Sequence, residues 1–316
     1  MCRCHLKKAG EIVVKPLHLG VLYILASAAG FGVMSIFAVY AYGAGVSVST
    51  LLFLRFLFAA GLFFGLLALR KESLRLNRRQ VLALFCLGGV LYTLQSLSFF
   101  SAVQHIPTSM AALLLYTFPV FVAVLSYFVD KEPLTRKTVF AMLLSLVGLG
   151  LVLGLSFGGV KMLGVLLALA AALFYSVYII VGNRIVKGLS PYVTSGYISL
   201  FAAVSTFLIA QKDGGVDLAF APTGWWALGG IVVFSTVMAI SFFFRGLQLI
   251  SSTKASVLST FEPVVTFFFS ALLFGEAFSL LQLLGGGAVL AGAALIVAGN
   301  DTKSSQIQQV QEGANP

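Results

Sequence analysis

Charged residues are scarce in this chain. Of its 316 residues only 9% are Asp, Glu, Lys or Arg, whereas soluble domains carry about 25%. Hydrophobic residues make up 59%, and long, nearly uncharged runs recur between residues 17 and 298. Each run is long enough to cross the hydrocarbon core of a bilayer. The scarcity of charge therefore excludes a soluble globular domain and predicts an all-α integral membrane protein.

Cysteine is also scarce, and its distribution excludes a disulfide framework. Cys2, Cys4 and Cys86 are an odd number, and Cys86 falls within an apolar run. Cys2, Cys4 and His5 lack a fourth ligand for a metal such as zinc, so we predict no metal site and no cofactor. The N-terminus also lacks the short apolar stretch and cleavage site of a secretory signal, so we expect the first apolar run to be retained as a helix.

Ten apolar runs are bounded by Gly, Pro, Asn and charged clusters, and we predict that each forms one transmembrane helix. The first five predicted helices cover residues 17–42, 47–69, 81–103, 109–129 and 138–157. The second five cover residues 162–182, 193–210, 225–244, 255–274 and 280–298. We therefore divide the chain into four parts. Residues 1–16 form an N-terminal cytoplasmic segment, residues 17–157 the first five-helix repeat, residues 162–298 the second, and residues 299–316 a disordered cytoplasmic tail.

Ten transmembrane helices place successive loops on alternate sides of the membrane, and Lys and Arg are distributed unequally between these two sides. The net charge is +10, but 17 of the 20 Lys and Arg residues fall on one side, with Lys161 and Lys212 on the other and Arg55 within a helix. Such a bias marks the cytoplasmic side of a membrane protein. We therefore predict a multi-pass membrane protein with both termini in the cytoplasm, and we attribute the positive charge to topology, not to nucleic-acid binding.

The two halves of the chain are repeats. Sliding the chain against itself by 144 residues aligns them without gaps, and the matched pairs include Gln104 with Gln248, Pro119 with Pro263, and Glu132 with Glu276. Each half holds five helices, an odd number, so the second half enters the membrane upside down. In inverted-repeat proteins the two bundles rock about a site near the midplane. The repeat therefore predicts a secondary transporter that works by alternating access.

These features resemble the drug/metabolite transporter superfamily, specifically its EamA-type members. The resemblance rests on three segments, which are Leu54-Arg55-Phe56, residues 102–119 with their repeat 246–263, and the acidic pair Glu132 and Glu276. It implies ten helices in two five-helix repeats and a plasma-membrane carrier, often an exporter of amino acids or other small metabolites. It also implies a central cavity between the halves, but it implies no particular substrate.

Two charged residues fall within predicted helices, Arg55 in the second and Glu262 in the ninth. A charge at the bilayer centre costs about 2.5–3.5 kcal/mol on insertion scales, so each should face a cavity or a partner. Their depths allow a direct ion pair. We interpret Glu262 as a site for a proton or a substrate amine, with a purely structural carboxylate as the alternative. We interpret Arg55 as a fixed anchor between helices, with a clamp on a substrate carboxylate as the alternative.

Pro119 and Pro263 predict breaks in the fourth and ninth helices. A proline within a helix removes one backbone hydrogen bond and frees a carbonyl one turn earlier. Pro263 directly follows Glu262, whereas Phe118 precedes Pro119. This asymmetry between the repeats makes Glu262 the more specific candidate for a functional group.

Polar and aromatic residues at three- and four-residue spacing share faces of three predicted helices. The faces are formed by Tyr92, Gln95, Ser96 and Phe99, by Tyr175, Tyr178 and Gly182, and by Ser259, Glu262 and Thr266. We predict an aromatic, mostly uncharged cavity in which the substrate contacts Tyr92, Gln95, Tyr116, Tyr175, Tyr178, Ser259 and Glu262. The alternative for each residue is hydrogen bonding between helices, which is common in membrane bundles.

We predict transport, in the export direction, of an amino acid or a related zwitterionic or amphipathic metabolite. The alternative is an uptake or exchange carrier for sugar phosphates or nucleotide sugars. The anionic groups of such substrates require more than one cation in the cavity. A channel is less favoured, because channels have repeated pore-lining rings and this sequence has one asymmetric acidic residue within a predicted helix. A membrane-embedded enzyme is also less favoured, because the sequence contains no His-Glu-x-x-His, Gly-x-Ser-x-Gly or paired intramembrane aspartate motif. Coupling to protons and assembly as a monomer or homodimer are left open.

Overall fold

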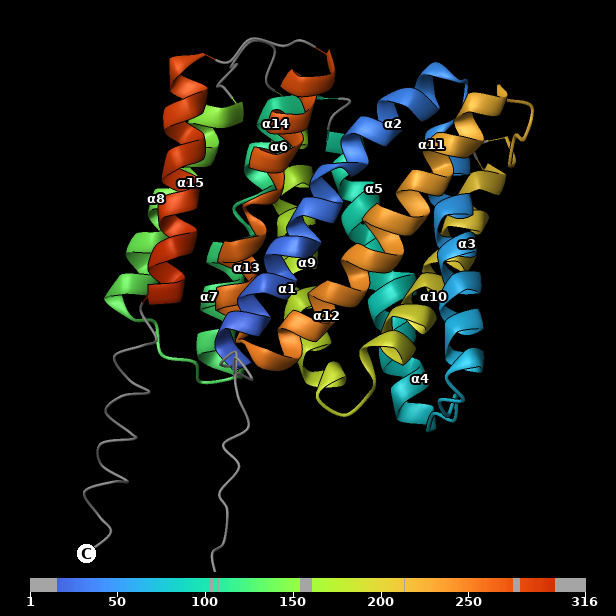
Figure 1. Cartoon of the computed structure of the whole chain (residues 1–316), viewed down its shortest axis with the longest axis horizontal. Coiled ribbons are helices and arrows are strands. Elements are labelled where there is room, and N and C mark those ends of the chain that lie inside the picture. The colour runs from blue at the N-terminus through green and yellow to red at the C-terminus, as the bar shows by residue number, and fades with distance from the viewer. Residues whose placement is uncertain are drawn as a thin grey trace, which may run out of the picture.

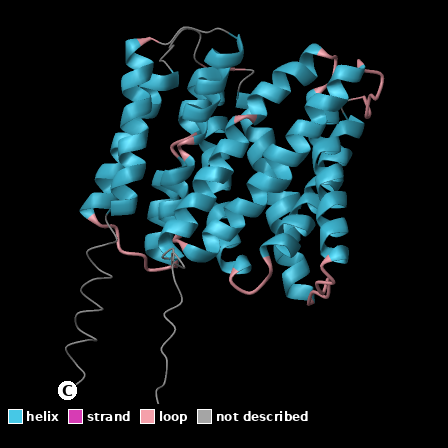
Figure 2. Cartoon of the chain, viewed as in Figure 1, coloured by secondary structure: helices cyan, strands magenta, loops and turns pink. Residues whose placement is uncertain are grey.

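The computed structural model describes residues 16–102, 105–106, 108–153, 161–212, 214–274 and 279–298, and every regular element in these ranges is a helix (Figure 1, Figure 2). The first half contains α1 (Pro16–Gly32), α2 (Met34–Gly43), α3 (Val48–Leu69), α4 (Arg78–Phe85), the π-helical segment η1 (Cys86–Tyr92), α5 (Thr93–Ala102), α6 (Thr108–Leu115), α7 (Phe118–Val129) and α8 (Arg136–Leu153). The second half contains α9 (Met162–Val186), α10 (Pro191–Lys212), α11 (Pro222–Val232), the π-helical segment η2 (Val233–Met238), α12 (Ala239–Leu249), α13 (Ser252–Ser259), α14 (Glu262–Phe274) and α15 (Leu280–Ala298). Cys2, Cys4 and His5, together with Gln104, Glu276 and the tail from residue 299, lie outside the described residues.

Each of the ten predicted spans corresponds to a single helix or to a run of consecutive helices. Five spans are interrupted, and they are formed by α1 with α2, α4 with η1 and α5, α6 with α7, α11 with η2 and α12, and α13 with α14. Within the described ranges, six helical stretches are long and apolar enough to cross a membrane, namely Leu17–Gly43, Val48–Leu69, Arg78–Phe99, Met162–Val186, Pro191–Lys212 and Pro222–Leu249. The prediction of an all-α membrane protein is confirmed.

The outer surface of the bundle carries many large apolar side chains. Phe128 is 73% exposed, and Leu57, Phe140, Val147 and Leu272 are also exposed. Soluble monomers rarely present large contiguous apolar patches to water, whereas lipid tails accept such side chains. The exposed apolar residues therefore mark the surface that faces the membrane.

The fourth and ninth spans break where the two prolines occur. Pro119 has no N–H to donate to the Leu115 carbonyl, and Pro263 has none to donate to Ser259. Near each break a threonine hydroxyl donates to a carbonyl three residues earlier, from Thr117 in the first half and Thr260 in the second. The helices end at Leu115 and Ser259 and resume after two residues. The predicted helix breaks are present in both halves.

The third and eighth spans each contain a π-helical turn. Thr236 donates its hydroxyl to the Ile231 carbonyl at 2.9 Å, and Thr93 donates to the Gly88 carbonyl at 3.5 Å. In both cases the donor reaches back five residues, which is the spacing of the widened turn. Such turns occur frequently at functional sites. The two halves therefore share this irregularity as well.

The two halves pack against each other reciprocally. α1 packs against α12, α13 and α14 of the second half, and α9 packs in the same way against α5, α6 and α7 of the first half. Two further contacts join equivalent helices, α3 with α10 and α8 with α15. The first span of each half therefore lies against the third and fourth spans of the other half.

Close approaches of glycine confirm this reciprocity residue by residue. A Cβ added to Gly20 would lie 2.7 Å from Ile250, and a Cβ added to Gly164 would lie 2.8 Å from Ile106. Gly20 and Gly164 are 144 residues apart, and so are Ile106 and Ile250. The offset found in the sequence thus reappears as an exchange of equivalent contacts between the halves.

The loops after α3, α7, α9 and α12 all lie at one end of the bundle, the lower end in Figure 1. These loops and the adjacent helix ends carry most of the basic residues, including Arg70, Arg136, Arg184, Lys187 and Arg245. We call this end the basic end.

Candidate transport site

Arg55 is buried in the middle of α3, with 2% of its surface exposed. Its Nε donates to the Thr236 hydroxyl at 2.8 Å, and Nη1 lies 2.9 Å from the sulfur of Met34. The guanidinium carbon lies 4.8 Å from the centre of the Phe56 ring. Among the described residues, Nη2 has no hydrogen-bond partner although it is buried. Arg55 is thus a buried cation with neutral neighbours and one unused donor group.

Glu262 is the first residue of α14 and follows the break in the ninth span directly. A carboxylate is favourable at this position because the N-terminus of a helix carries partial positive charge. Tyr116, from the break in the fourth span, lies beside Glu262 and interacts with its carboxylate. Glu262 is only partly exposed. The two helix breaks, one from each half, therefore meet at this carboxylate.

Arg55 and Glu262 do not form an ion pair. No nitrogen of Arg55 lies within 4.0 Å of a Glu262 oxygen. The direct contact that the sequence left open is therefore absent in this conformation.

A continuous series of aromatic rings connects the surroundings of the two charges. The centroid distances are 5.0 Å from Phe56 to Tyr92, 6.3 Å from Tyr92 to Tyr178, 6.0 Å from Tyr178 to Tyr175, 4.7 Å from Tyr175 to Phe118 and 6.2 Å from Phe118 to Tyr116. Contacts of this geometry are favourable between rings. We call these six residues the aromatic path. It runs from the ring beneath Arg55 to the tyrosine beside Glu262.

The aromatic path and the Arg55 site are related by the repeat. Thr236 and Met34, which contact Arg55, are 144 residues from Tyr92 and Tyr178 respectively. Each pair takes one residue from each half: Met34 and Thr236 contact the buried Arg55, whereas Tyr178 and Tyr92 form a pair of neighbouring rings. The inverted repeat therefore builds two chemically different walls from equivalent positions.

The structure brings four predicted site residues together and leaves others with partners of their own. Tyr92, Tyr116, Tyr175 and Tyr178 belong to the aromatic path. Gln95 accepts a hydrogen bond from Ser96 at 3.3 Å, Ser259 donates to Ala255 at 2.9 Å, and Thr266 donates to Gly32 at 2.8 Å.

Four residues of the site were not among the predicted ones. Phe56 and Phe118 complete the aromatic path, and Met34 and Thr236 contact Arg55. Phe118 occupies the position equivalent to Glu262, and Thr236 the position equivalent to Tyr92. The repeat offset was therefore the signal that identifies two of them.

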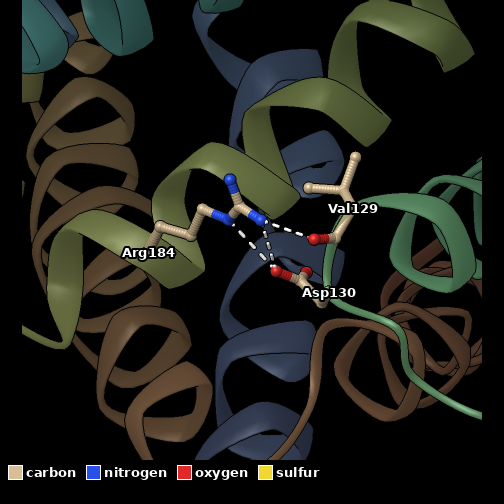
Figure 3. A network of polar contacts seen from close by, with 3 residues as sticks. All are labelled: Val129, Asp130 and Arg184. Carbon is tan, nitrogen blue, oxygen red and sulfur yellow. Dashed lines mark hydrogen bonds and ion pairs between the residues drawn. The ribbon is translucent and has the colours of Figure 1, made fainter.

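At the basic end the two halves are joined by polar contacts. Figure 3 shows Arg184 of α9 pointing to the end of α7, where its Nε and Nη2 each lie 3.0 Å from Asp130 Oδ1 and Nη2 also donates to the Val129 carbonyl at 2.8 Å. Glu132 accepts hydrogen bonds from Ser251 at 2.5 Å and from Thr253 at 3.1 Å. These contacts connect first-half residues to second-half residues below the site.

A family model for the EamA-like transporter family matches residues 18–154 and again residues 162–298. The chain belongs to the EamA-like transporter family. The two matches coincide with the two halves of the structure, so each half of this EamA-like transporter is one copy of the family's repeat. The resemblance predicted from the sequence is confirmed.

Relatives of this EamA-like transporter are also transporters. An uncharacterized transporter of Archaeoglobus fulgidus is 31% identical over 277 residues, which cover 85% of this chain and 93% of that protein. An S-adenosylmethionine/S-adenosylhomocysteine transporter of Chlamydia trachomatis is 27% identical over 258 residues, covering 77% of this chain and 78% of that protein. A crystal structure with 20% identity superimposes with a TM-score of 0.74 over 87% of this chain and 95% of that one, which shows the shared fold. This protein is a multi-pass membrane transporter.

Proposed function

We propose that this protein is a secondary transporter that exports a small zwitterionic metabolite, such as an amino acid, across the plasma membrane by alternating access. The observation that carries the proposal is the aromatic path between Arg55 and Glu262. A zwitterion carries a carboxylate and an amine, which match a guanidinium and a carboxylate respectively. Between them, aromatic faces favour apolar, aromatic or cationic parts of a ligand.

The position of the site supports alternating access. Glu262 and Tyr116 come from equivalent breaks in the two halves, so a change in the angle between the halves would alter the contact between them. Irregular backbone at membrane depth is tolerated where it lines a cavity or is buried in protein. In this mechanism the substrate amine, or a proton, replaces Tyr116 as the partner of the Glu262 carboxylate during the cycle.

The Chlamydia relative supports a choice of substrates for testing. Its name assigns it S-adenosylmethionine and S-adenosylhomocysteine, which combine an amino-acid zwitterion with an aromatic base. Both groups are complementary to a site with Arg55, Glu262 and the aromatic path. The substrate panel should therefore include these two compounds beside the free amino acids.

The deciding experiment measures flux of radiolabelled amino acids and S-adenosylmethionine in proteoliposomes, with and without a pH gradient, for the wild type and Glu262→Gln. We expect saturable wild-type flux that falls about tenfold or more in the variant, because hydrogen bonds to charged groups contribute about 1.5–3 kcal/mol. Asp217→Asn is the matched control, since Asp217 is exposed in the loop before α11.

The outcomes separate the parts of the proposal. Absence of flux for every compound in the panel would remove the zwitterionic substrate class. If the flux of Glu262→Gln equals that of the wild type, the role of Glu262 is structural. Acceleration by a pH gradient in the wild type, lost in Glu262→Gln, would identify the proton as the coupling ion.

We also infer that the basic end faces the cytoplasm, together with both termini. The inference rests on the 17 basic residues assigned to that side of the chain. In a cysteine-free background, a cysteine replacing Ser73 at the basic end should be labelled by an impermeant thiol reagent only from the cytoplasmic side. A cysteine replacing Leu218 at the opposite end should be labelled only from outside, and the reverse result would contradict the orientation.

A further inference from the structure

A pocket lies at the basic end, away from the candidate transport site. Its volume is about 450 Å³, and it is lined by Tyr23, Arg70, Glu72, Ser190, Pro191, Tyr192, Arg245, Gln248 and Leu249. Arg70 directly follows α3, in which Arg55 lies 15 residues earlier. At 1.5 Å per residue that separation is about 22 Å along the helix. The pocket is therefore distinct from the site between Arg55 and Glu262.

Two arginines of this pocket share one aromatic ring. The guanidinium carbon of Arg70 lies 4.5 Å from the centre of the Tyr192 ring, and that of Arg245 lies 4.8 Å from the same centre. These distances together bound the separation of the two guanidinium carbons at about 9.3 Å. Arg245 also donates to the Tyr23 hydroxyl at 3.4 Å. The ring contacts hold both cations at the wall of the pocket.

Neither cation is neutralised by a carboxylate. In the part of the chain that the structure describes, no carboxylate oxygen lies within 4.0 Å of a nitrogen of Arg70 or Arg245, although Glu72 lines the same pocket. The basic end does contain a paired arginine, since Arg184 contacts Asp130 at 3.0 Å. Two guanidinium groups held close together without an anion repel each other.

The wall of the pocket is positioned by hydrogen bonds that do not use the two arginines. Gln248 donates its amide N–H to the carbonyls of Val186 at 2.8 Å and Leu189 at 3.3 Å. These carbonyls lie at the end of α9 and in the loop that leads to Ser190 and Tyr192. Gln248 therefore fixes the loop between α9 and α10, next to the start of α10 where Tyr192 lies.

We propose that this pocket binds a phosphate-type oxyanion between Arg70 and Arg245. Guanidinium groups bind phosphate in a bidentate geometry, and the Ser190 and Tyr23 hydroxyls in the lining offer further donors. The anion is either the phosphate of a membrane lipid headgroup or that of a soluble ligand. Arg70 belongs to the first half and Arg245 to the second, so a bound anion connects the halves and favours the conformation that keeps them close.

The test compares the thermal unfolding temperature, Tm, of lipid-depleted protein with four additions. These are phosphatidylglycerol, diacylglycerol without a phosphate, inorganic phosphate, and chloride at equal ionic strength. We expect a Tm rise of about 2–4 °C for the wild type with phosphatidylglycerol or with inorganic phosphate. The rise should be lost in the double variant Arg70→Gln and Arg245→Gln. The matched control is Arg136→Gln, since Arg136 is an exposed arginine at the same end outside the pocket.

A rise with phosphatidylglycerol alone identifies a lipid headgroup, and a rise with inorganic phosphate identifies a soluble ligand. If neither addition raises the wild-type Tm above its control, or if Arg136→Gln loses the effect as well, the proposal is overturned. Should the double variant fail to fold, Arg70→Gln alone serves instead, because Arg70 is exposed and makes no hydrogen bond within 3.5 Å from its side chain in the described structure. The readout does not depend on transport, so it stands or falls separately from the proposed function.

Discussion

Gly32 lies so close to Glu262 that a Cβ at Gly32 would come within 2.7 Å of the Glu262 carbonyl oxygen. The equivalent contact in the other half joins Ser176 to Phe118, where the serine hydroxyl donates to the Phe118 carbonyl at 3.1 Å. Each residue of one pair is 144 residues from its counterpart in the other. The first span of each half thus packs on the helix break of the other half. In one case the contact requires glycine, and in the other it is a hydrogen bond.

Replacing Gly32 with alanine should therefore disturb the break at Glu262. The added methyl group meets backbone, which cannot rotate away, and overpacking of this kind costs about 1–3 kcal/mol. We expect Gly32→Ala to lower both the flux in proteoliposomes and the Tm. Gly61→Ala is the control, because nothing lies within 4 Å of a Cβ at Gly61 in α3. Equal flux in the two variants would show that transport does not depend on the spacing between Gly32 and Glu262.

Much of the fold could be predicted from the sequence, because a bilayer restricts the length of apolar runs and the placement of basic residues. Apolar runs indicate spans, and basic loops indicate their alternation. Pro119 and Pro263 then located the two helix breaks, since the loss of a backbone N–H acts locally. The offset of 144 residues identified the repeat, which the reciprocal contacts of Gly20 and Gly164 reproduce.

The partners within the site could not be read in the same way. Arg55 contacts Thr236, 181 positions along the chain, and no ion pair with Glu262 is formed. Periodicity within one helix shows which residues share a face, but it does not show which other helix that face meets. Phe118 and Thr236 were missed because neither an aromatic residue nor a threonine is unusual in an apolar span.

The contact between Thr236 and Arg55 predicts a stability effect. Thr236→Val removes the acceptor for Arg55 Nε and leaves a second buried guanidinium nitrogen without a partner. An unsatisfied buried donor costs about 1–3 kcal/mol, and more when it is charged. We expect a clear fall in Tm, measured by differential scanning fluorimetry.

The matched control for this effect is Thr206→Val in α10. Thr206 is also buried, but its hydroxyl bonds only to the carbonyls of Ala202 and Ala203 in its own helix. Its replacement leaves no charged group unpaired. A Tm loss as large as that of Thr236→Val would mean that the Arg55 contact contributes nothing beyond the loss of a threonine hydroxyl.

Tyr175 should separate ring packing from hydroxyl chemistry along the aromatic path. Its ring lies 4.7 Å from Phe118 and 6.0 Å from Tyr178. If the substrate rests against this ring, Tyr175→Phe should keep the KM for transport within about twofold. Tyr175→Leu should raise the KM about fivefold, because aromatic contacts contribute about 0.5–1.5 kcal/mol. Saturation curves for the three proteins decide this, and a similar KM for Phe and Leu would argue against ring contact with the substrate.

The contact of Arg184 with Asp130 predicts a small, salt-dependent coupling between the halves. The two side chains are 54% and 27% exposed, and exposed ion pairs contribute about 0.2–1 kcal/mol. A double-mutant cycle with Arg184→Ala and Asp130→Ala, measured by unfolding, should give a coupling in this range that decreases as salt is added. Arg184→Ala should destabilise more than Asp130→Ala, because Arg184 also donates to the Val129 carbonyl and caps the end of α7. The same cycle on Arg136 and Asp217, at opposite ends of the bundle, should give no coupling. A coupling energy unaffected by salt would contradict this prediction. It would mean that water is excluded from the contact between Arg184 and Asp130.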